Sequence, residues 1–190
     1  SRTLSSGRSL LVVQYNPFHI SLTHNFCDDM VKIGDSLNIK NAKIKDGNNA
    51  NRSSKVSWLE GENFPNHLHQ CIDSANKLYN FSLYEFEPIQ YTIYEEGDHY
   101  DWHIDNHKEP YHNGMIRKLS FTLCLNDDFE GGDFNICETH PISEKTKIKT
   151  FSLKKGDMIV FPSHTWHKVE KVTKGIRKAL VGWVVGKQWK

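Results

Sequence analysis

Two segments in the first half of the chain place their apolar residues at the spacing of an α-helix. The first is the stretch 22–37, LTHNFCDDMVKIGDSL, with apolar residues at Phe26, Met30, Ile33 and Leu37. The second is the stretch 65–81, PNHLHQCIDSANKLYNF, with apolar residues at Leu68, Cys71, Ile72, Ala75 and Leu78. This periodicity predicts two amphipathic helices, and Pro65 stands where proline commonly opens a helix. The polar stretch 43–55 between them predicts an exposed loop.

From about Leu83 onward the pattern changes to short segments rich in β-branched and aromatic residues. Gly, Asp or Asn separates most of these segments, as expected for turns between strands. Roughly eight strands are expected in this part of the chain. The clearest segments are 84–95, 116–126, 133–139, 149–153, 157–162, 167–172 and 177–186.

Two helices followed by a run of strands predict an α+β, mainly β fold, in which helices pack on one side of a β-sandwich or barrel. The length of 190 residues fits a single domain spanning 1–190. Within it, residues 1–83 are expected to form a helical support region and residues 84–186 the β core. A barrel of this kind has an open-mouthed cavity, which is where a ligand would bind.

Composition and charge narrow the class of protein. The net charge is +1, so no overall basic field attracts nucleic acid or an anionic membrane. No apolar run approaches the roughly 20 residues of a membrane span. Four widely spaced cysteines without a C-x-x-C pair are expected to be reduced and buried, which favours a reducing, cytoplasmic compartment. Neither nucleic acid nor a membrane is therefore expected as a partner.

The segment 95–107, EEGDHYDWHIDNH, carries the strongest candidate chemistry. It holds two overlapping H-x-D patterns, His99-Tyr100-Asp101 and His103-Ile104-Asp105. With 11 histidines in the chain, one such pattern is expected by chance, so the pattern alone is no evidence of a site. In a strand, however, residues i and i+2 point to the same face, so His103 and Asp105 can present an imidazole and a carboxylate together.

One more histidine from a distant strand would complete the set of two histidines and one carboxylate that binds Fe(II) and leaves open positions. His164 and His167 are both candidates for this third ligand. Arg177 follows at the head of the apolar stretch RKALVGWVV. A cation at the start of a buried strand needs an anion, which a dicarboxylate held bidentately would supply.

A series of motifs follows in a fixed order over residues 84–186, with weaker support in the stretch 52–59. The motifs are Gln90-Tyr91, Tyr94-x-x-Gly97-x-x-Tyr100-x-x-His103-x-Asp105, Arg117-Lys118-Leu119-Ser120, Glu130-Gly131-Gly132-Asp133, Gly156-Asp157, Phe161-Pro162-Ser163, His167-x-Val169 and Thr173-x-Gly175-x-Arg177. In this order they resemble the Fe(II)/2-oxoglutarate-dependent dioxygenases, in particular the prolyl 4-hydroxylase-like branch. The resemblance implies a double-stranded β-helix, or jelly-roll, barrel.

The same resemblance implies an enzyme that hydroxylates an unactivated C–H bond, foremost that of a prolyl residue in a peptide or protein, and releases succinate and CO2. It implies Fe(II), 2-oxoglutarate and O2 as cofactors and co-substrates, with ascorbate as an accessory reductant. Its register selects His103, Asp105 and His167 as metal ligands over His99, Asp101 and His164. Arg177 is then expected to pair with the distal carboxylate of 2-oxoglutarate.

By resemblance, Tyr94 lies near the co-substrate, and a hydroxyl of Thr122 or Ser120 adds to the same pocket. Substrate-side residues are expected to be Tyr100, Arg117 and Trp183. Two positions depart from the family pattern. Cys124 replaces a tyrosine that helps to bind the distal carboxylate in many relatives, and Val185 replaces a polar substrate-side residue. The first weakens the expected co-substrate pocket, and the second weakens the case for a peptidyl-proline substrate.

Other classes of protein stay open at this point. Within the oxygenase class, the substrate could be a free amino acid or another small molecule instead of a peptide. A nucleic-acid demethylase would need a second arginine after the distal histidine, and a zinc hydrolase would not need Arg177. A non-catalytic carboxylate-binding barrel would be expected to lack one of the three ligands. The segments 43–55 and 106–115 are expected to form the lid that selects the substrate.

Overall fold

The computed structural model describes residues 17–42, 51–106, 109–143 and 146–189. Its helices are α1 (His24–Ser36), α2 (His67–Tyr79) and the short 3-10 helix η2 (Gly61–Asn63). Its strands in the first half of the chain are β1 (Phe18–Ser21), β2 (Lys40–Asn41), β3 (Arg52–Ser53) and β4 (Lys55–Leu59). Those in the second half are β5 (Glu85–Phe86), β6 (Ile89–Tyr94), β7 (His99–His103), β8 (Met115–Cys124), β9 (Phe129–Gly131), β10 (Phe134–Cys137), β11 (Lys149–Phe151), β12 (Asp157–Pro162), β13 (Trp166–Val169), β14 (Val172–Gly175) and β15 (Arg177–Lys187).

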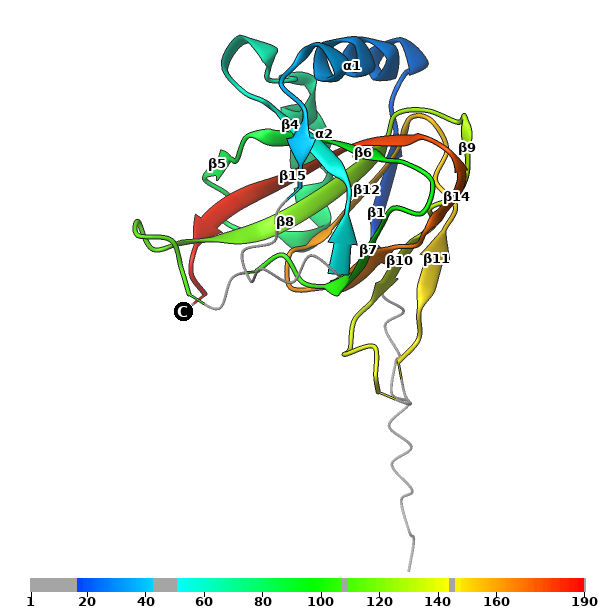
Figure 1. Ribbon diagram of the computed structural model, residues 1–190. Helices are drawn as coiled ribbons and strands as arrows, with labels where there is room; N and C mark the ends of the chain where they lie inside the picture. Colours follow the sequence, from blue (N-terminus) through cyan, green and yellow to red (C-terminus); the bar gives the residue numbers. More distant parts are fainter. Residues whose placement is uncertain (1–16, 43–50, 107–108, 144–145, 190) are drawn as a thin grey trace, which may run out of the picture.

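Most of the strands form two antiparallel sheets (Figure 1). The larger sheet has eight strands in the order β1-β12-β8-β15-β6-β4-β2, with β5 paired to β15. The smaller sheet has five strands in the order β11-β10-β13-β7-β3, and β14 and β9 form a separate pair. Sequence neighbours are rarely neighbours in a sheet, so each sheet joins distant parts of the chain. The expected mainly β architecture is confirmed.

The larger sheet packs against different partners on its two faces. Val160 of β12 belongs to the core cluster that includes Leu68 of α2 and other residues of both helices. The next residue back, Ile159, belongs to a second cluster with Phe134 of the smaller sheet. Because successive side chains of a strand point to opposite faces, the helices cover one face of the larger sheet and the smaller sheet covers the other. The space between the two sheets is where the candidate site lies.

Both expected helices are present, each with a local reason for its start. Thr23 caps α1, because its hydroxyl accepts a hydrogen bond from the backbone N–H of Phe26 at 3.3 Å. Helix α2 begins at His67, two residues after Pro65, whose carbonyl accepts from the N–H of Leu68 at 3.0 Å. It ends at Asn80, which adopts a left-handed conformation with φ of 53°.

The region 1–83 contributes more than helical support, because it also supplies strands to both sheets. β1 pairs with β12 and β4 pairs with β6 in the larger sheet, while β3 pairs with β7 in the smaller one. β3 lies inside the stretch 43–55 that was expected to be a loop, whose residues 43–50 lie outside the described ones. The four strands of this region, β1 to β4, have two to five residues each, which is too short for a periodic pattern to reveal them.

The four cysteines are free and buried, as the sequence predicts. Burial raises the pKa of the thiol of Cys27 to about 11, so this side chain packs as a small neutral group. Among the described residues, no helix is long and apolar enough to cross a membrane.

Gly34 of α1 lies directly against the ring of Tyr91, and a Cβ added at this position would overlap that ring. Alanine in place of glycine ordinarily stabilises a helix by about 1 kcal/mol. Here the ring has no room to move, because Tyr91 is fully buried and its hydroxyl donates to Asp35 at 2.7 Å. We expect Gly34→Ala to lower the free energy of unfolding by about 1–3 kcal/mol in urea titrations. The matched variant Asp29→Ala, on the exposed face of α1, should change it by no more than about 0.5 kcal/mol; a stabilised Gly34→Ala protein would contradict this packing.

Candidate active site

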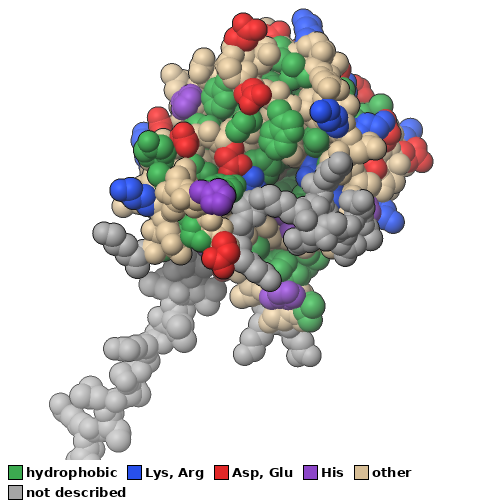
Figure 2. Space-filling model, turned by 60° about the vertical axis from the view of Figure 1, so that its left-hand side comes forward, with side chains coloured by type: hydrophobic (Ala, Val, Ile, Leu, Met, Phe, Trp, Pro, Cys, Tyr) green, Lys and Arg blue, Asp and Glu red, His purple; other side chains and the backbone are tan. Residues whose placement is uncertain are grey.

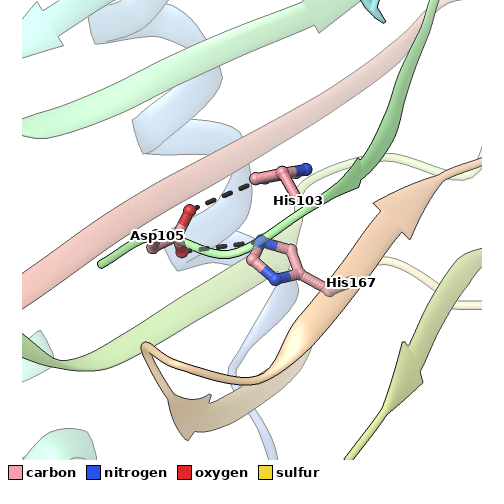
Figure 3. A group of neighbouring side chains, drawn as sticks. All are labelled: His103, Asp105 and His167. Atoms are coloured by element: carbon pink, nitrogen blue, oxygen red, sulfur yellow. Dashed lines mark ion pairs between the residues drawn. The ribbon is translucent and has the colours of Figure 1, made fainter. Parts of the chain in front are cut away.

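Three side chains from two distant segments of the chain meet between the sheets: His103, Asp105 and His167 (Figure 3). His103 is the last residue of β7, and His167 lies opposite it in β13. Nε2 of His103 is 3.6 Å from Oδ1 of Asp105, and Nε2 of His167 is 3.5 Å from Oδ2. The ligand atoms all lie within 4.8 Å of one another. Bonds of about 2 Å to one metal ion need these atoms within about 4 Å of one another, so small side-chain movements would let the three residues bind one ion.

The backbone orients both imidazole rings. Nδ1 of His103 bonds to the carbonyl oxygen of Asp101 at 2.7 Å, and Nδ1 of His167 bonds to that of Thr165 at 2.9 Å. A carbonyl oxygen only accepts, so Nδ1 carries the hydrogen in each ring and Nε2 holds the lone pair. Both lone pairs are therefore available beside the Asp105 carboxylate, with the outer hydrogen bond that metal-binding histidines usually make.

A β-bulge in β7 decides which residues of this strand face the site. His167 pairs with His103, whereas Val169 pairs with Tyr100, so β7 holds one extra residue over this span. The extra residue shifts the alternation of side chains by one position. Tyr100 and His103 consequently lie on the same face, and their rings stack with centroids 3.6 Å apart and planes 12° apart.

The competing histidines lie away from this cluster. His99 faces Ser53 of β3, with 3.5 Å between its Nδ1 and the serine Oγ, and Asp101 is exposed. His164 is exposed in the turn before β13. The structure thus brings together the three residues that the family register selects, and it leaves His99, Asp101 and His164 outside.

Asp105 reaches the cluster from beyond the end of its strand. The two side chains meet as expected, but the expectation that they do so as positions i and i+2 of one strand is wrong, because β7 ends at His103. Instead, the backbone N–H groups of Asp105 and Asn106 both donate to the carbonyl oxygen of Ser163, at 2.9 and 3.2 Å. The hydroxyl of Ser120 donates to that of Ser163 at 2.9 Å. These bonds anchor the turn that presents the carboxylate.

The charges in this cluster suit a divalent cation. Burial lowers the pKa of His103, and the nearby His167 lowers it further, so the imidazole stays neutral. Burial on its own would raise the pKa of Asp105, but the two histidines and Arg117 outweigh it and lower this pKa below its usual range. The cluster therefore offers a carboxylate at Asp105 and a neutral imidazole at His103, and Oδ2 of Asp105 has no hydrogen-bond partner among the described residues.

Arg177 is the second unusual feature of this interior. It is 1% exposed, and none of Nε, Nη1 and Nη2 has a hydrogen-bond partner within the described part of the chain. The rings of Tyr94 and Phe129 lie 5.5 and 6.0 Å from the guanidinium carbon and compensate only part of its charge. Gly132 makes room for the side chain, since a Cβ there would lie 2.8 Å from Cδ of Arg177. A buried guanidinium with three unpaired nitrogens fits a carboxylate ligand.

The other residues expected around the co-substrate also line the inner face of the larger sheet. Tyr94 is 2% exposed and pairs with Arg177 across β6 and β15. Thr122 lies two residues before Cys124 in β8, and Cys124 belongs to the cluster between the sheets. Since residues i and i+2 of a strand point to the same face, the hydroxyl of Thr122 faces the same interior. Ser120 already bonds to Ser163, which leaves Thr122 as the better placed of the two hydroxyls. The thiol of Cys124 donates to the carbonyl of Asn126 at 3.3 Å.

The residues expected on the substrate side lie close together. The guanidinium of Arg117 stacks on the ring of Trp183 at 3.8 Å. Trp58, which is 44% exposed, lies beside Trp183 with ring centroids 6.4 Å apart. The third of these residues, Tyr100, stacks directly on the candidate ligand His103.

Two charged residues near the site were not singled out from the sequence. Arg52 places its guanidinium 4.6 Å from the centre of the Tyr100 ring and donates to Oε1 of Gln90 at 2.7 Å. Glu87 accepts two hydrogen bonds from Arg117, at 2.8 and 2.6 Å. Arg52 lies in a stretch that predicts a loop, and Glu87 lies between two strands, so only the tertiary structure reveals their neighbours.

Comparison with known families assigns the chain to a class. The model of the 2OG-Fe(II) oxygenase superfamily matches residues 89–185, just over half of the chain. The chain therefore belongs to the 2OG-Fe(II) oxygenase superfamily, whose members use Fe(II), 2-oxoglutarate and O2. The matched residues include all three of the clustered ligands and Arg177. This confirms the family that the sequence motifs indicate.

The more specific relatives are hydroxylases. A PKHD-type hydroxylase of a Synechococcus species is 44% identical over 110 residues, which cover 57% of this chain and 42% of the relative. A PKHD-type hydroxylase of Prochlorococcus marinus is 34% identical over 146 residues, which cover 75% of this chain and 60% of the relative. The chain spans about half the length of the curated relatives it matches.

Solved structures show the same fold. A Pseudomonas putida prolyl-4-hydroxylase superposes with a TM-score of 0.68 and 16% identity, covering 90% of this chain and 92% of that one. A Trichoplax adhaerens prolyl hydroxylase, solved in complex with a hypoxia inducible factor oxygen degradation domain peptide fragment, has a TM-score of 0.68 and 20% identity, covering 88% and 82%. Both structural alignments extend well beyond residues 89–185 into the N-terminal half of this chain.

The geometry predicts which histidines are needed for metal binding. We expect His167→Ala to weaken the binding of Co(II), used as a spectroscopic probe, by more than about 100-fold, because it removes one of three ligands and leaves Asp105 less compensated. The measurement is a titration of the visible Co(II) absorption in the purified protein. His164→Ala, three residues away and exposed, is the matched control and should bind Co(II) like the wild type. Stronger impairment by His164→Ala than by His167→Ala would refute the assignment.

Proposed function

We propose that this chain is the catalytic domain of an Fe(II)- and 2-oxoglutarate-dependent dioxygenase. It hydroxylates an unactivated C–H bond, with a prolyl residue of a peptide or protein as the preferred substrate, and it releases succinate and CO2. The family membership gives the class of reaction. The identity of the substrate is the part that rests on the site itself.

One observation carries this proposal: the buried guanidinium of Arg177, which has no hydrogen-bond partner among the described residues, shares an interior with the His103, Asp105 and His167 cluster. A zinc hydrolase would use the cluster but would leave the cost of burying Arg177 unexplained. An oxygenase explains both, because its co-substrate is a dicarboxylate that brings the missing negative charge. Two unsatisfied groups of opposite sign, Asp105 and Arg177, are thus matched by a cation and an anion.

The residues present fit these two groups. His103, Asp105 and His167 would hold the metal ion, and Arg177 would pair with a carboxylate of 2-oxoglutarate. Once bound, the metal and the co-substrate supply the oxygen activation that hydroxylation needs. The protein fixes both imidazole tautomers through backbone carbonyls, presents Asp105 on an anchored turn and covers His103 with Tyr100. Covering the site in this way excludes water from it.

A prolyl substrate suits the indole rings of this interior. Trp58 is 44% exposed and lies beside Trp183, and a pyrrolidine ring packs well against such flat apolar faces. The structural neighbour from Trichoplax adhaerens binds a peptide, which supports a peptide substrate for this chain. Acidic and basic side chains are interspersed on the face that Figure 2 shows, which favours a peptide over nucleic acid.

We also propose that the two sheets form a double-stranded β-helix, or jelly-roll, barrel within a single domain. Its support is the order of strands in the sheets and the likeness to prolyl hydroxylase structures. Ascorbate as an accessory reductant and the cytoplasmic compartment stay predictions from the sequence.

The class of reaction has a direct spectroscopic test. We expect anaerobic addition of Fe(II) and then 2-oxoglutarate to give a visible charge-transfer band, and air to give succinate. His167→Ala should give neither, because the metal is lost. Tight Zn(II) binding with no band and no succinate would instead favour a hydrolase.

The role of Arg177 has an independent test in protein stability. We expect Arg177→Met to leave the melting temperature of the ligand-free protein unchanged or higher, because an uncompensated buried charge is removed. The same variant should bind 2-oxoglutarate at least about 100-fold more weakly and should lose the rise in melting temperature that 2-oxoglutarate with Fe(II) gives under anaerobic conditions.

Lys178→Met is the matched control for this change. Lys178 is the next residue of β15, and its ammonium group bonds to Asp35 at 2.7 Å on the helix-covered face of the sheet. This variant should keep the full response to 2-oxoglutarate. An equal response in the Arg177→Met protein would show that the guanidinium does not bind the co-substrate.

A further inference from the structure

Glu87 and Arg117 form a paired charge cluster beside the candidate metal ligands. Nε and Nη2 of Arg117 donate to the two carboxylate oxygens of Glu87 at 2.8 and 2.6 Å. The hydroxyl of Tyr111 donates to Oε1 of the same carboxylate at 2.7 Å. The side chains of Arg117 and Glu87 are 14% and 18% exposed, so both charges are largely withdrawn from water. Such a bidentate pair is among the strongest that proteins form.

A β-bulge directs Arg117 toward this side of the sheet. Along β8 and β15, Leu119 pairs with Val184, but Arg117 pairs with Val185, so Lys118 is an extra residue. Without the bulge, Arg117 would share the helix-covered face with Leu119, which belongs to the core under the helices. With it, the guanidinium stacks on Trp183 at 3.8 Å.

Strand pairing and hydrogen bonds join this cluster to the metal-binding residues. Trp183 pairs with Ser120 across β15 and β8, and Ser120 bonds to Ser163. Ser163 in turn accepts the N–H of Asp105. Because Arg117 stacks on Trp183, these links connect its guanidinium to the turn that presents Asp105. We therefore expect a substrate whose C–H bond reaches the metal to contact this cluster.

The pairing determines which substrates the cluster can bind. A lone arginine at this position would attract a carboxylate, such as that of a free amino acid. Glu87 cancels that charge and places its own negative charge nearby, so an incoming carboxylate meets no net attraction. Nε1 of Trp183 is buried without a hydrogen-bond partner among the described residues. This indole N–H can donate to a neutral acceptor such as an amide carbonyl.

We propose that Glu87 is a specificity-determining residue, which masks Arg117 so that the site accepts a residue within a peptide chain and rejects its free carboxylate form. The recognised group is an uncharged amide on the carbonyl side of the reacting residue. This inference rests on the proposed function, because it concerns the substrate of that same site.

The test compares two compounds that differ only in this group. N-acetyl-L-prolinamide is neutral, and N-acetyl-L-proline carries a carboxylate. Dissociation constants for both are measured by calorimetry on the protein loaded with 2-oxoglutarate and with Zn(II) in place of Fe(II), so that no turnover occurs. In the wild type we expect the amide to bind more tightly than the acid. In Glu87→Gln the acid should gain about tenfold while the amide changes little, because the guanidinium becomes available to a carboxylate.

Glu85→Gln is the matched control, since Glu85 is exposed two residues earlier and the variant changes the net charge by the same amount. Its acid-to-amide ratio should equal that of the wild type. Arg117→Gln provides a second test if Glu87→Gln does not fold, because an unpaired Glu87 should repel the acid and widen the preference for the amide. Thermal melting establishes which variants are folded.

An acid-to-amide ratio that stays the same in Glu87→Gln and Arg117→Gln would overturn the inference, as would a wild type that binds neither compound or prefers the acid. An equal gain for the acid in Glu85→Gln would show a general charge effect and would overturn it too. These outcomes are separate from those that test the reaction. A protein without 2-oxoglutarate-dependent succinate release would refute the proposed function, whereas the binding ratio is measured without turnover.

Discussion

The alternation of side chains in the eight-stranded sheet is the constraint on which the rest of the structure depends. In β12, Ile159 and Val160 point to opposite faces, one toward the smaller sheet and one toward the helices. The helix-covered face is apolar and supplies the largest core cluster. The inner face can then carry polar groups such as Thr122 and Arg177, because the hydrophobic stabilisation comes mainly from the other side.

The alternation of side chains is interrupted at the site once in each sheet. The bulge in β7 brings Tyr100 and His103 onto one face, and the bulge in β8 brings Arg117 onto the face of Trp183. Each costs a regular pair of ladder hydrogen bonds and re-aims one functional side chain. The site is therefore built where the sheets depart from regular pairing, and its ligands are held by backbone carbonyls instead of by long flexible side chains.

The buried charges of this interior are of two kinds. Arg117 is paired with Glu87 within the chain, whereas Arg177 and Asp105 keep unpaired atoms among the described residues. A charge that the chain leaves unpaired is matched by a ligand of opposite sign in the proposed function. A charge that is paired within the chain no longer attracts a ligand of opposite sign. For this reason we assign Glu87, which pairs with Arg117, a role in substrate selection.

The sequence alone determined the family, both helices, the main strands, the four cysteines as buried thiols and the residues now seen in the cluster. It could do so because helical periodicity and β-rich segments are local signals, and because the motifs occur in a fixed order. It could not locate β1 to β4, the bulges, or the neighbours of Arg52 and Glu87. Those depend on pairing between segments far apart in the chain: Arg117 meets Glu87 only because β5 lies along β15 and a bulge turns β8 by one residue. Register is a property of two strands together, so the motif order could select His103 over His99, but only the tertiary structure showed the bulge that aims Tyr100 and His103 at the site.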